Sequence, residues 1–254
     1  FHLEDAKIQL ASTLEIPLQL DKFLLNQCEL SLESQATLQL NCNAQLWNTE
    51  IIKTGNKQNA SVVASKGTLD IQHCQFSGGR PAISIHDSVQ WEMANTKVAN
   101  AYLGLRATTA PQLFLANSFT GNTTGGQITG GDYLIERSLF HNNDVGLILS
   151  GSSKWIQIES CDFSSNGSAG LQSVQSNLHV LCSTFSYNAI GVTAFKGQLK
   201  LAKNAGNTFE NNTVGVSFQN LEKLELQQGH NTFSQQVIFD LAGSFAPAAS
   251  ISYN

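Results

Sequence analysis

Acidic, amide and aromatic residues recur at even spacing in two neighbouring segments of the chain. One segment carries Asp132 and Glu136, and the other carries Trp155, Gln157 and Glu159. A tryptophan ring is a broad apolar platform for the C–H groups of a sugar, while carboxylates and amides bond hydroxyls. This combination is typical of carbohydrate binding. We therefore expect Asp132, Trp155, Gln157 and Glu159 to form a ligand-binding surface.

The pair Glu136 and Glu159 also allows other chemistry. Two neighbouring carboxylates can act as acid and base on a glycosidic bond, with Arg137 stabilising charge. They can also bind calcium through their oxygen atoms. A third interpretation is structural, because charged side chains on an outer face keep strand edges from pairing. We assign no catalytic residue, no metal ligand and no cofactor. Glu136, Glu159 and Arg137 are the candidates for catalysis, and Ca²⁺ is the alternative cofactor.

A repeat of about 22 residues must position these side chains. A phenylalanine returns at spacings of 21, 23, 22 and 24 residues, each time with an asparagine three residues later. Phe76 and Phe233 extend the series, and Val98 takes the place between Phe76 and Phe119. A fixed period of this length is typical of a solenoid, in which each turn contacts only its neighbours. The repeating phenylalanines are Phe119, Phe140, Phe163, Phe185 and Phe209.

Each repeat has the pattern of short strands. In residues 154–171, isoleucines alternate with Gln157 and Glu159, a period of two that predicts a strand with one buried face. An asparagine–glycine turn follows, and a glycine–leucine step begins the next strand. No helical stretch separates the strands, which excludes a leucine-rich repeat. Because adjacent coils lie about 4.8 Å apart, Glu136 and Glu159, each four residues before a phenylalanine, are expected to be neighbours.

The repeated phrase Phe-x-x-Asn, followed by Gly-Leu or Gly-Val, covers residues 62–236. It resembles the right-handed parallel β-helix repeat of pectate-lyase-like and related secreted proteins, without singling out one family of that fold. The resemblance implies an all-β, single-stranded parallel β-helix of about eleven coils of roughly 22 residues. It also implies that the turn asparagines hydrogen-bond from coil to coil in a ladder. The asparagines of that ladder are Asn122, Asn143, Asn166, Asn188 and Asn212.

Phrases that would mark an enzyme of this fold do not occur in the sequence. Resemblance to polygalacturonases would imply Asn-Thr-Asp, Asp-Asp, Gly-His-Gly and Arg-Ile-Lys, and resemblance to alginate epimerases would imply Asp-Pro-His. Pectate-lyase-like sites need clustered aspartates with a catalytic arginine or lysine, yet only Arg137 of the three arginines lies near the acidic residues. We predict a non-catalytic module that binds polysaccharide or mediates adhesion. A polysaccharide lyase or hydrolase is the first alternative, and a structural stalk is the second.

Composition limits the partners. The net charge is −5, the sequence pI is about 5.6, and no basic cluster occurs. Nucleic acid and anionic membrane surfaces are therefore poor partners. No run reaches the roughly 18 apolar residues that suggest a membrane span. We expect a polysaccharide or a cell-surface glycan as the partner, and leave the oligomeric state open.

Five cysteines are an odd number, so they cannot all pair within one chain. We favour small buried thiols in the core. A disulfide between Cys28 and Cys42, or between Cys161 and Cys182, is the alternative.

The repeat argues for a single domain over residues 1–254. Within it we expect leucine-rich coils in residues 1–61, the phenylalanine repeats in 62–236 and closing strands in 237–254. In the first of these segments, Leu18 and Leu20 are expected to point inward from a strand. The chain starts without a basic n-region or an apolar h-region. We interpret it as a bacterial module excised from a larger secreted protein, located outside the cell or on its surface.

Overall fold

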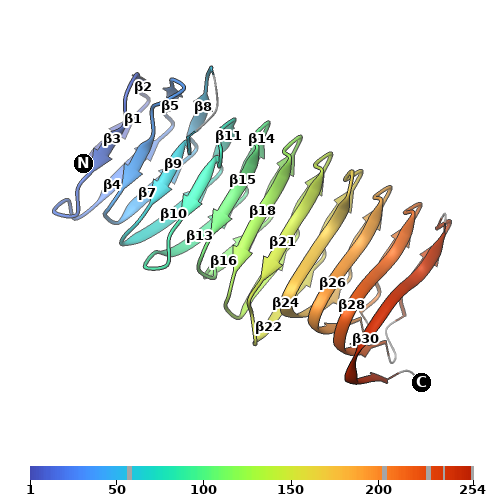
Figure 1. Ribbon diagram of the computed structural model, residues 1–254. Helices are drawn as coiled ribbons and strands as arrows, with labels where there is room; N and C mark the ends of the chain where they lie inside the picture. The colour runs from blue at the N-terminus through green and yellow to red at the C-terminus, as the bar shows by residue number, and fades with distance from the viewer. Residues whose placement is uncertain (56–58, 202–204, 227–229, 237, 253–254) are drawn as a thin grey trace. The chain divides into compact units, whose positions relative to one another are not determined.

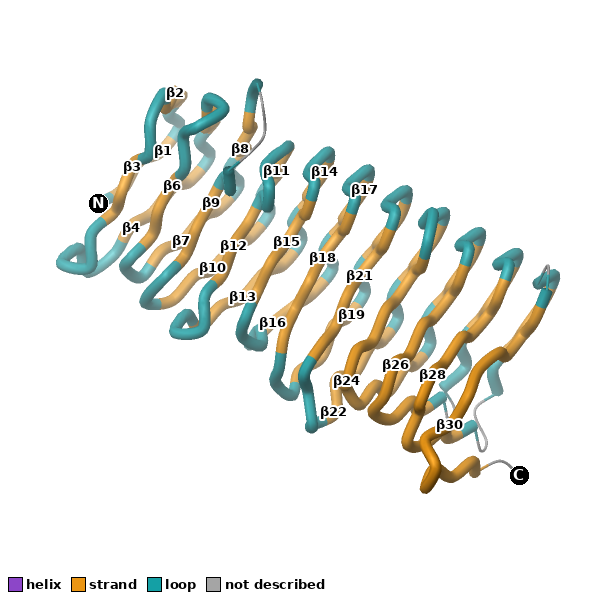
Figure 2. The backbone as a smooth tube through the Cα atoms, viewed as in Figure 1, coloured by secondary structure: helices purple, strands orange, loops and turns teal. Residues whose placement is uncertain are grey.

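The computed structural model of the 254-residue chain describes residues 1–55, 59–201, 205–226, 230–236 and 238–252. Among these residues there are 30 β-strands and no helix (Figure 2). The strands form a parallel β-solenoid of about eleven turns of roughly 22 residues, which confirms the expected fold class. The chain divides into two compact units, residues 1–128 and 129–254, and each is described by itself.

Each turn contributes strands to three faces of the solenoid. The first face starts at the glycine–aliphatic step, the second carries the alternating residues, and the third carries the core phenylalanine. Strands on one face pair in parallel with those of the next turn, so equivalent residues stack (Figure 1). Phe163, for example, is the register partner of both Phe140 and Phe185.

In the described part of the first unit, each face contains six strands. The first face consists of β3 (Leu14–Ile16), β6 (Leu38–Leu40), β9 (Val62–Ala64), β12 (Ile83–Ile85), β15 (Leu103–Ala107) and β18 (Thr124–Thr129), whose last residue opens the second unit. The second face consists of β1 (His2–Glu4), β4 (Phe23–Asn26), β7 (Ala44–Trp47), β10 (Thr68–Gln72), β13 (Gln90–Ala94) and β16 (Leu113–Leu115). The third face consists of β2 (Lys7–Leu10), β5 (Glu29–Leu32), β8 (Glu50–Lys53), β11 (Gln75–Ser77), β14 (Lys97–Ala99) and β17 (Ser118–Thr120).

In the second unit, long strands bend to serve both the first and the second face. These are β24 (Ala169–Leu181), β26 (Ile190–Lys200), β28 (Val214–Glu225) and β30 (Phe239–Ser252). β21 (Val145–Ser150) lies on the first face alone, and β19 (Tyr133–Glu136) and β22 (Trp155–Glu159) lie on the second. The third face consists of β20 (Leu139–His141), β23 (Asp162–Ser164), β25 (Thr184–Ser186), β27 (Thr208–Glu210) and β29 (Thr232–Ser234).

Residues in the left-handed backbone conformation form the corners of the third face. The residue three places before the core phenylalanine and the residue two places after it both have positive φ, as Ser160 (54°) and Ser165 (56°) do around Phe163. One left-handed residue turns the chain sharply and shifts the inward alternation by one residue, so that Ile158 and Cys161, on the two sides of Ser160, are both buried. Arg137 occupies such a corner with φ of 49°. Stacked neighbours impose this conformation even on residues that rarely adopt it.

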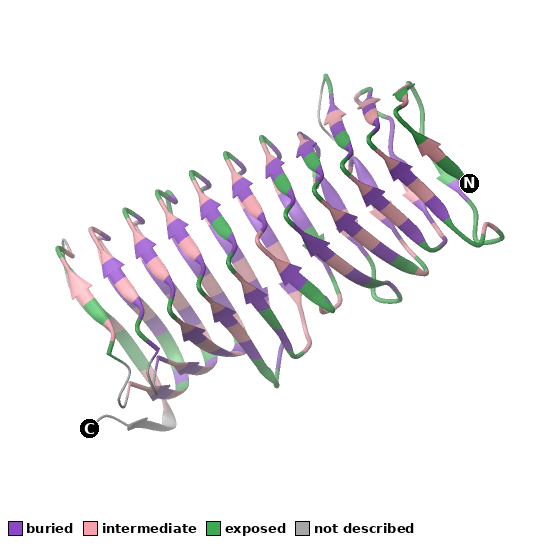
Figure 3. Ribbon diagram, turned by 180° about the vertical axis from the view of Figure 1, so that it is seen from behind, coloured by how far each residue is buried: buried purple, intermediate pink, exposed green. Residues whose placement is uncertain are grey.

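The core of the second unit contains a stack of aromatic rings. Phe140, Phe163, Phe185 and Phe209 are fully buried, and successive ring centroids lie 4.9 Å apart with nearly parallel planes. Burial of each ring contributes up to about 3 kcal/mol. Buried and half-exposed residues alternate along the strands, and the corners are the most exposed parts (Figure 3). Gly170 is required here because a Cβ would come within 2.8 Å of Gly191 O and 2.9 Å of Phe163 Cβ.

The turn asparagines stack in the second unit. The backbone amide and side-chain amide of Asn143 both donate to Asn166 Oδ1 at 3.1 Å. Asn166 repeats the pattern on Asn188, and Asn188 repeats it on Asn212, at 2.9 to 3.0 Å. The backbone amide of Asn212 donates to Gln236 Oε1 at 3.2 Å. In the first unit, Asn122 accepts from Ala101 N and donates to Val98 O.

A second polar column, which the sequence analysis did not recognise, lies two residues before the core aromatic position. Ser138 N donates to Cys161 Sγ at 3.4 Å, and Cys161 N donates to Ser183 Oγ at 3.1 Å. Ser183 N donates to Asn207 Oδ1 at 3.0 Å. The buried cysteine at this position therefore takes part in a column of hydrogen bonds and does more than fill space.

The cysteines follow the favoured interpretation in part, and one expectation about the chain was wrong. All five cysteines are free and four of them are buried, with Cys182 exposed, so neither alternative disulfide forms. Leu18 and Leu20 lie in the turn between β3 and β4 and not in a strand, and Leu18 is 57% exposed. Pro17 explains this, because its carbonyl accepts the hydrogen bond from Leu20 N that closes the turn. At the other end, Val237, Tyr253 and Asn254 lie outside the described residues, while β30 supplies a closing strand.

Candidate functional site

The predicted ligand-binding residues lie on the second face of the second unit. In β22, Trp155, Gln157 and Glu159 point outward, because Ile156 and Ile158 between them are fully buried in the core. Glu136 points outward from β19 in the same way. Residues on one face of adjacent parallel strands stand side by side, so these side chains share one surface.

Strand register shows which of these residues are neighbours. Glu136 pairs in register with Glu159, and Leu134 pairs with Gln157. Asp132 precedes Tyr133, the register partner of Ile156, and Trp155 precedes Ile156. Asp132 and Trp155 thus hold equivalent positions on neighbouring coils, and both are exposed.

Both glutamates have a partner on their own strand or corner. Arg137 Nε lies 3.0 Å from Glu136 Oε1. Gln157 Nε2 donates to Glu159 Oε2 at 2.9 Å. These contacts compensate the repulsion between two stacked carboxylates. They also occupy oxygen atoms that acid–base chemistry or a calcium ion would need.

Trp155 is the exposed aromatic residue of this surface, with 37% of its area accessible. Lys200, on β26, places its Nζ 5.8 Å from the centroid of the Trp155 ring. Asn177 on β24 is the register partner of Trp155, and His179 is the partner of Gln157. The surface therefore combines an apolar ring with an ammonium group, amides and carboxylates.

Sequence analysis missed Asn177 and Lys200. Both residues could have been found from their positions in the repeat. Asn177 is the register partner of Trp155, and Lys200 is the register partner of His179, which pairs with Gln157. The signal was present in the repeat, because counting forward from β22 by one and two coils leads to these positions.

The first unit carries another tryptophan, Trp47, on its second face, and the indole nitrogen of this residue is already hydrogen-bonded. Trp47 Nε1 donates to Asp70 Oδ2 at 2.9 Å, and Gln45 Nε2 lies 3.4 Å from the same oxygen. The polar edge of this indole is therefore already engaged. Trp155 has no such bond to a carboxylate among the described residues, which distinguishes it as the ring available to a ligand.

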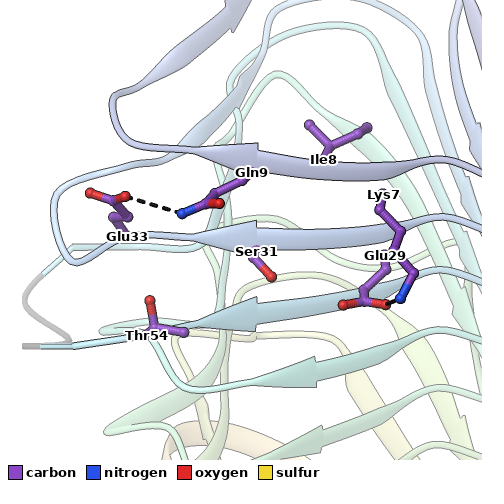
Figure 4. Close-up of a pocket in the computed structure, with 7 residues that line it drawn as sticks. All are labelled: Lys7, Ile8, Gln9, Glu29, Ser31, Glu33 and Thr54. Carbon is purple, nitrogen blue, oxygen red and sulfur yellow. Dashed lines mark hydrogen bonds and ion pairs between the residues drawn. The ribbon is translucent and has the colours of Figure 1, made fainter.

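A polar pocket on the third face of the first unit differs from the Trp155 surface, because its charged side chains already have partners. Its volume is about 420 Å³, and its charged groups pair with one another (Figure 4). Lys7 Nζ lies 2.8 Å from Glu29 Oε2, and Gln9 Nε2 donates to Glu33 Oε1 at 3.3 Å. The carboxylate of Glu29 raises the pKa of Lys7. Each charged side chain of this pocket therefore already has a partner.

The described residues contain no group of three or more His, Cys, Asp or Glu side chains that could hold a metal ion. Nor do they contain a helix with the length and apolar character that a membrane span requires.

Comparison with known proteins identifies the fold. The sequence profile of a family described as "Right handed beta helix region" matches residues 62–238. No curated protein was found to match the chain. Two solved structures are similar, both of A-modules of mannuronan C-5 epimerases from Azotobacter vinelandii. The AlgE6 module has 13% identity, a TM-score of 0.46 and coverage of 88% of this chain and 89% of that chain. The AlgE4 module has 12% identity, a TM-score of 0.44 and coverage of 88% of this chain and 91% of that chain. Likenesses this low carry no argument about activity.

Proposed function

The chain belongs to the right-handed β-helix family, and from that premise we propose that its second face binds a polysaccharide without altering it chemically. The observation that carries this proposal is the exposed ring of Trp155 beside outward-pointing amide, carboxylate and ammonium groups. Sugars present apolar C–H faces and hydroxyl rims, so this mixture of groups complements them.

Two features favour binding over catalysis. Glu136 is paired with Arg137, and Glu159 accepts a hydrogen bond from Gln157. The second face is a flat stack of parallel strands rather than an enclosed cleft. A flat, rigid face presents side chains at the coil spacing of about 4.8 Å and orders few groups when a polymer binds, which limits the entropic cost of association.

The proposal is tested with a glycan array and one variant. We expect the protein to bind at least one polysaccharide, and Trp155→Ala to weaken that binding at least tenfold, a loss of about 1.4 kcal/mol. The melting temperature should stay unchanged because Trp155 is exposed. Tyr187→Ala is the matched control, since Tyr187 is 65% exposed on a corner of the same unit. Absence of binding across the array contradicts the proposal.

Catalysis is the second candidate function, favoured by the register pairing of Glu136 with Glu159. Retaining glycosidases hold their carboxyl groups about 5 to 5.5 Å apart, a distance that adjacent coils allow. In this case the bound polysaccharide should acquire new reducing or unsaturated ends, and Glu136→Gln and Glu159→Gln should each abolish them. If the polymer is still intact after prolonged incubation, cleavage is excluded and binding is the only function that remains. Adding EDTA or CaCl₂ to both assays tests calcium as a cofactor.

The proposed ligand class also suggests where the protein works. We propose an extracellular or cell-surface location, as an adhesive module of a larger secreted bacterial protein, because structural polysaccharides lie outside the cell. Labelling of intact cells with an impermeant reagent should detect the chain. Recovery of the chain only after lysis would contradict this location.

A further inference from the structure

The N-terminal end of the first unit exposes part of the solenoid core. An apolar pocket of about 300 Å³ lies there, and every residue that lines it has an apolar side chain. Phe1 and Leu14 belong to this lining and are 63% and 39% exposed, and Leu18, in the turn after β3, is 57% exposed. Contact of clustered apolar surface with water is unfavourable, and an exposed patch of this kind indicates a contact site.

The strands around the pocket are edge strands. β1, β2 and β3 pair in parallel with β4, β5 and β6 of the next turn, and they are the outermost strands at this end (Figure 1). Within β1 the direction of the backbone groups follows from one hydrogen bond, because Phe1 O accepts from Leu24 N of β4. Backbone groups of successive residues point to opposite edges of a strand, so those of His2 and Glu4 point away from β4.

The strand β1 is complementary to a second copy of itself. Leu3 lines the pocket, while His2 and Glu4 on either side of it are exposed. If two copies of β1 lie antiparallel with Leu3 opposite Leu3, His2 of each copy lies opposite Glu4 of the other. The backbone groups of these two residues then bond each other across the contact, and each imidazole lies beside a carboxylate.

Glu4 retains an oxygen for this contact. Its Oε1 accepts from Asn26 Nδ2 at 2.9 Å. Its Oε2 lies 3.9 Å from His2 Nε2 of the same strand, which is longer than a hydrogen bond. The imidazole of a second copy can therefore donate to Oε2.

We propose that this end of the first unit is a contact surface between two copies of the chain, which associate end to end around a two-fold axis at Leu3. The two β1 strands continue the sheet of the second face across the axis, and the two apolar pockets cover each other. A two-fold contact uses the same patch on both copies, so it closes after two chains and gives a dimer. Apolar burial supplies the affinity, and the reciprocal His2–Glu4 pairs set the register. This inference does not depend on polysaccharide binding.

Analytical ultracentrifugation of the full chain at about 1 to 200 µM measures the association. We expect monomers to convert to dimers as the concentration rises, without larger species. Leu3→Lys should abolish the dimer, because it places an ammonium group in the apolar contact. Circular dichroism should show that this variant keeps its β-structure, since Leu3 lies at the end of the core and is half-buried.

A charge exchange tests the register with exposed residues alone. His2→Glu places glutamate opposite glutamate twice in the dimer and should raise its dissociation constant about fivefold or more. Adding Glu4→His to this variant restores the opposite pairing and should recover the dimer. His86→Glu is the matched control, since His86 is an exposed histidine in the turn between β12 and β13 of the same unit, and it should leave the dimer unchanged.

Three results would overturn the inference. The first is a chain that stays monomeric at every concentration. The second is a monomer whose end binds an apolar dye such as ANS and loses the dye in Leu3→Lys, which would assign the pocket to an apolar ligand. The third is a dimer that persists in both Leu3→Lys and His2→Glu, because its contact would lie elsewhere on the chain.

Discussion

The cysteines two residues before the core aromatic position show how burial changes the chemistry of a side chain. Cys161 is buried, donates its thiol toward Glu159 O and Ile135 O, and accepts from Ser138 N. Desolvation by burial raises the pKa of the Cys161 and Cys74 thiols to about 12. Such thiols are protonated at neutral pH and therefore inert as nucleophiles. Cys182 lies on a corner and is exposed.

We predict that the native protein has one fast-reacting thiol. At pH 8, a disulfide reagent such as DTNB should titrate Cys182 within minutes, because only the thiolate reacts and the pKa values of Cys74 and Cys161 lie about four units above this pH. All five cysteines should react in urea. Cys182→Ser should remove the fast phase, and a fast phase that persists in this variant would contradict the burial of the other four.

Two columns of hydrogen bonds connect successive coils, and the sequence predicted the asparagine column but not the other. The turn asparagines share a residue type and a position, so the phrase Phe-x-x-Asn was sufficient to place Asn143 and Asn166 at the same corner. The second column uses Cys161, Ser183 and Asn207 at equivalent positions. These residues share only small size and hydrogen-bonding capacity, a pattern that residue identity does not reveal.

The candidate site shows the same limit at the level of strands. The phase of the repeat was sufficient to predict that Glu136 and Glu159 are neighbours, because a strand has a period of two and the coils repeat. It did not predict that Lys200 approaches Trp155, since that contact depends on a side-chain conformation two coils away.

The asparagine column yields a stability prediction. Asn166→Ala should lower the free energy of unfolding by about 3 kcal/mol, because unsatisfied buried groups cost about 1–3 kcal/mol each. The groups that lose their hydrogen bond to Asn166 are Asn143 N, which donates to Asn166 Oδ1, and Phe140 O, which accepts from Asn166 Nδ2 at 2.9 Å. Urea denaturation measures the change. Gln172→Ala, at an outward position of β24, is the control and should change stability by less than about 0.5 kcal/mol. Equal effects of the two variants would show that the column adds no stability.

At the scale of the whole molecule, the period of the repeat predicted the solenoid, while features that break the period escaped prediction. The expected strand at Leu18 and Leu20 failed because Pro17 starts a turn there. The bends within the long strands of the second unit also escaped, since left-handed residues such as Gln175 and Lys196 carry no common residue type. A repeat reveals what successive coils share, whereas the proposed binding surface around Trp155 consists of residues in which the coils differ.

Because each coil contacts mainly its neighbours, damage to one coil should stay local. Phe163 stacks on Phe140 and Phe185 at 4.9 Å and is fully buried. Phe163→Ala should cost about 3–5 kcal/mol. Hydrogen exchange should accelerate most in β20, β23 and β25, and much less in β2 and β5 of the first unit, since those strands keep all their packing partners. Ser164→Ala on the outward side of β23 is the control. A uniform acceleration across all strands would contradict nearest-neighbour stability, because it would mean that the chain opens as one cooperative unit.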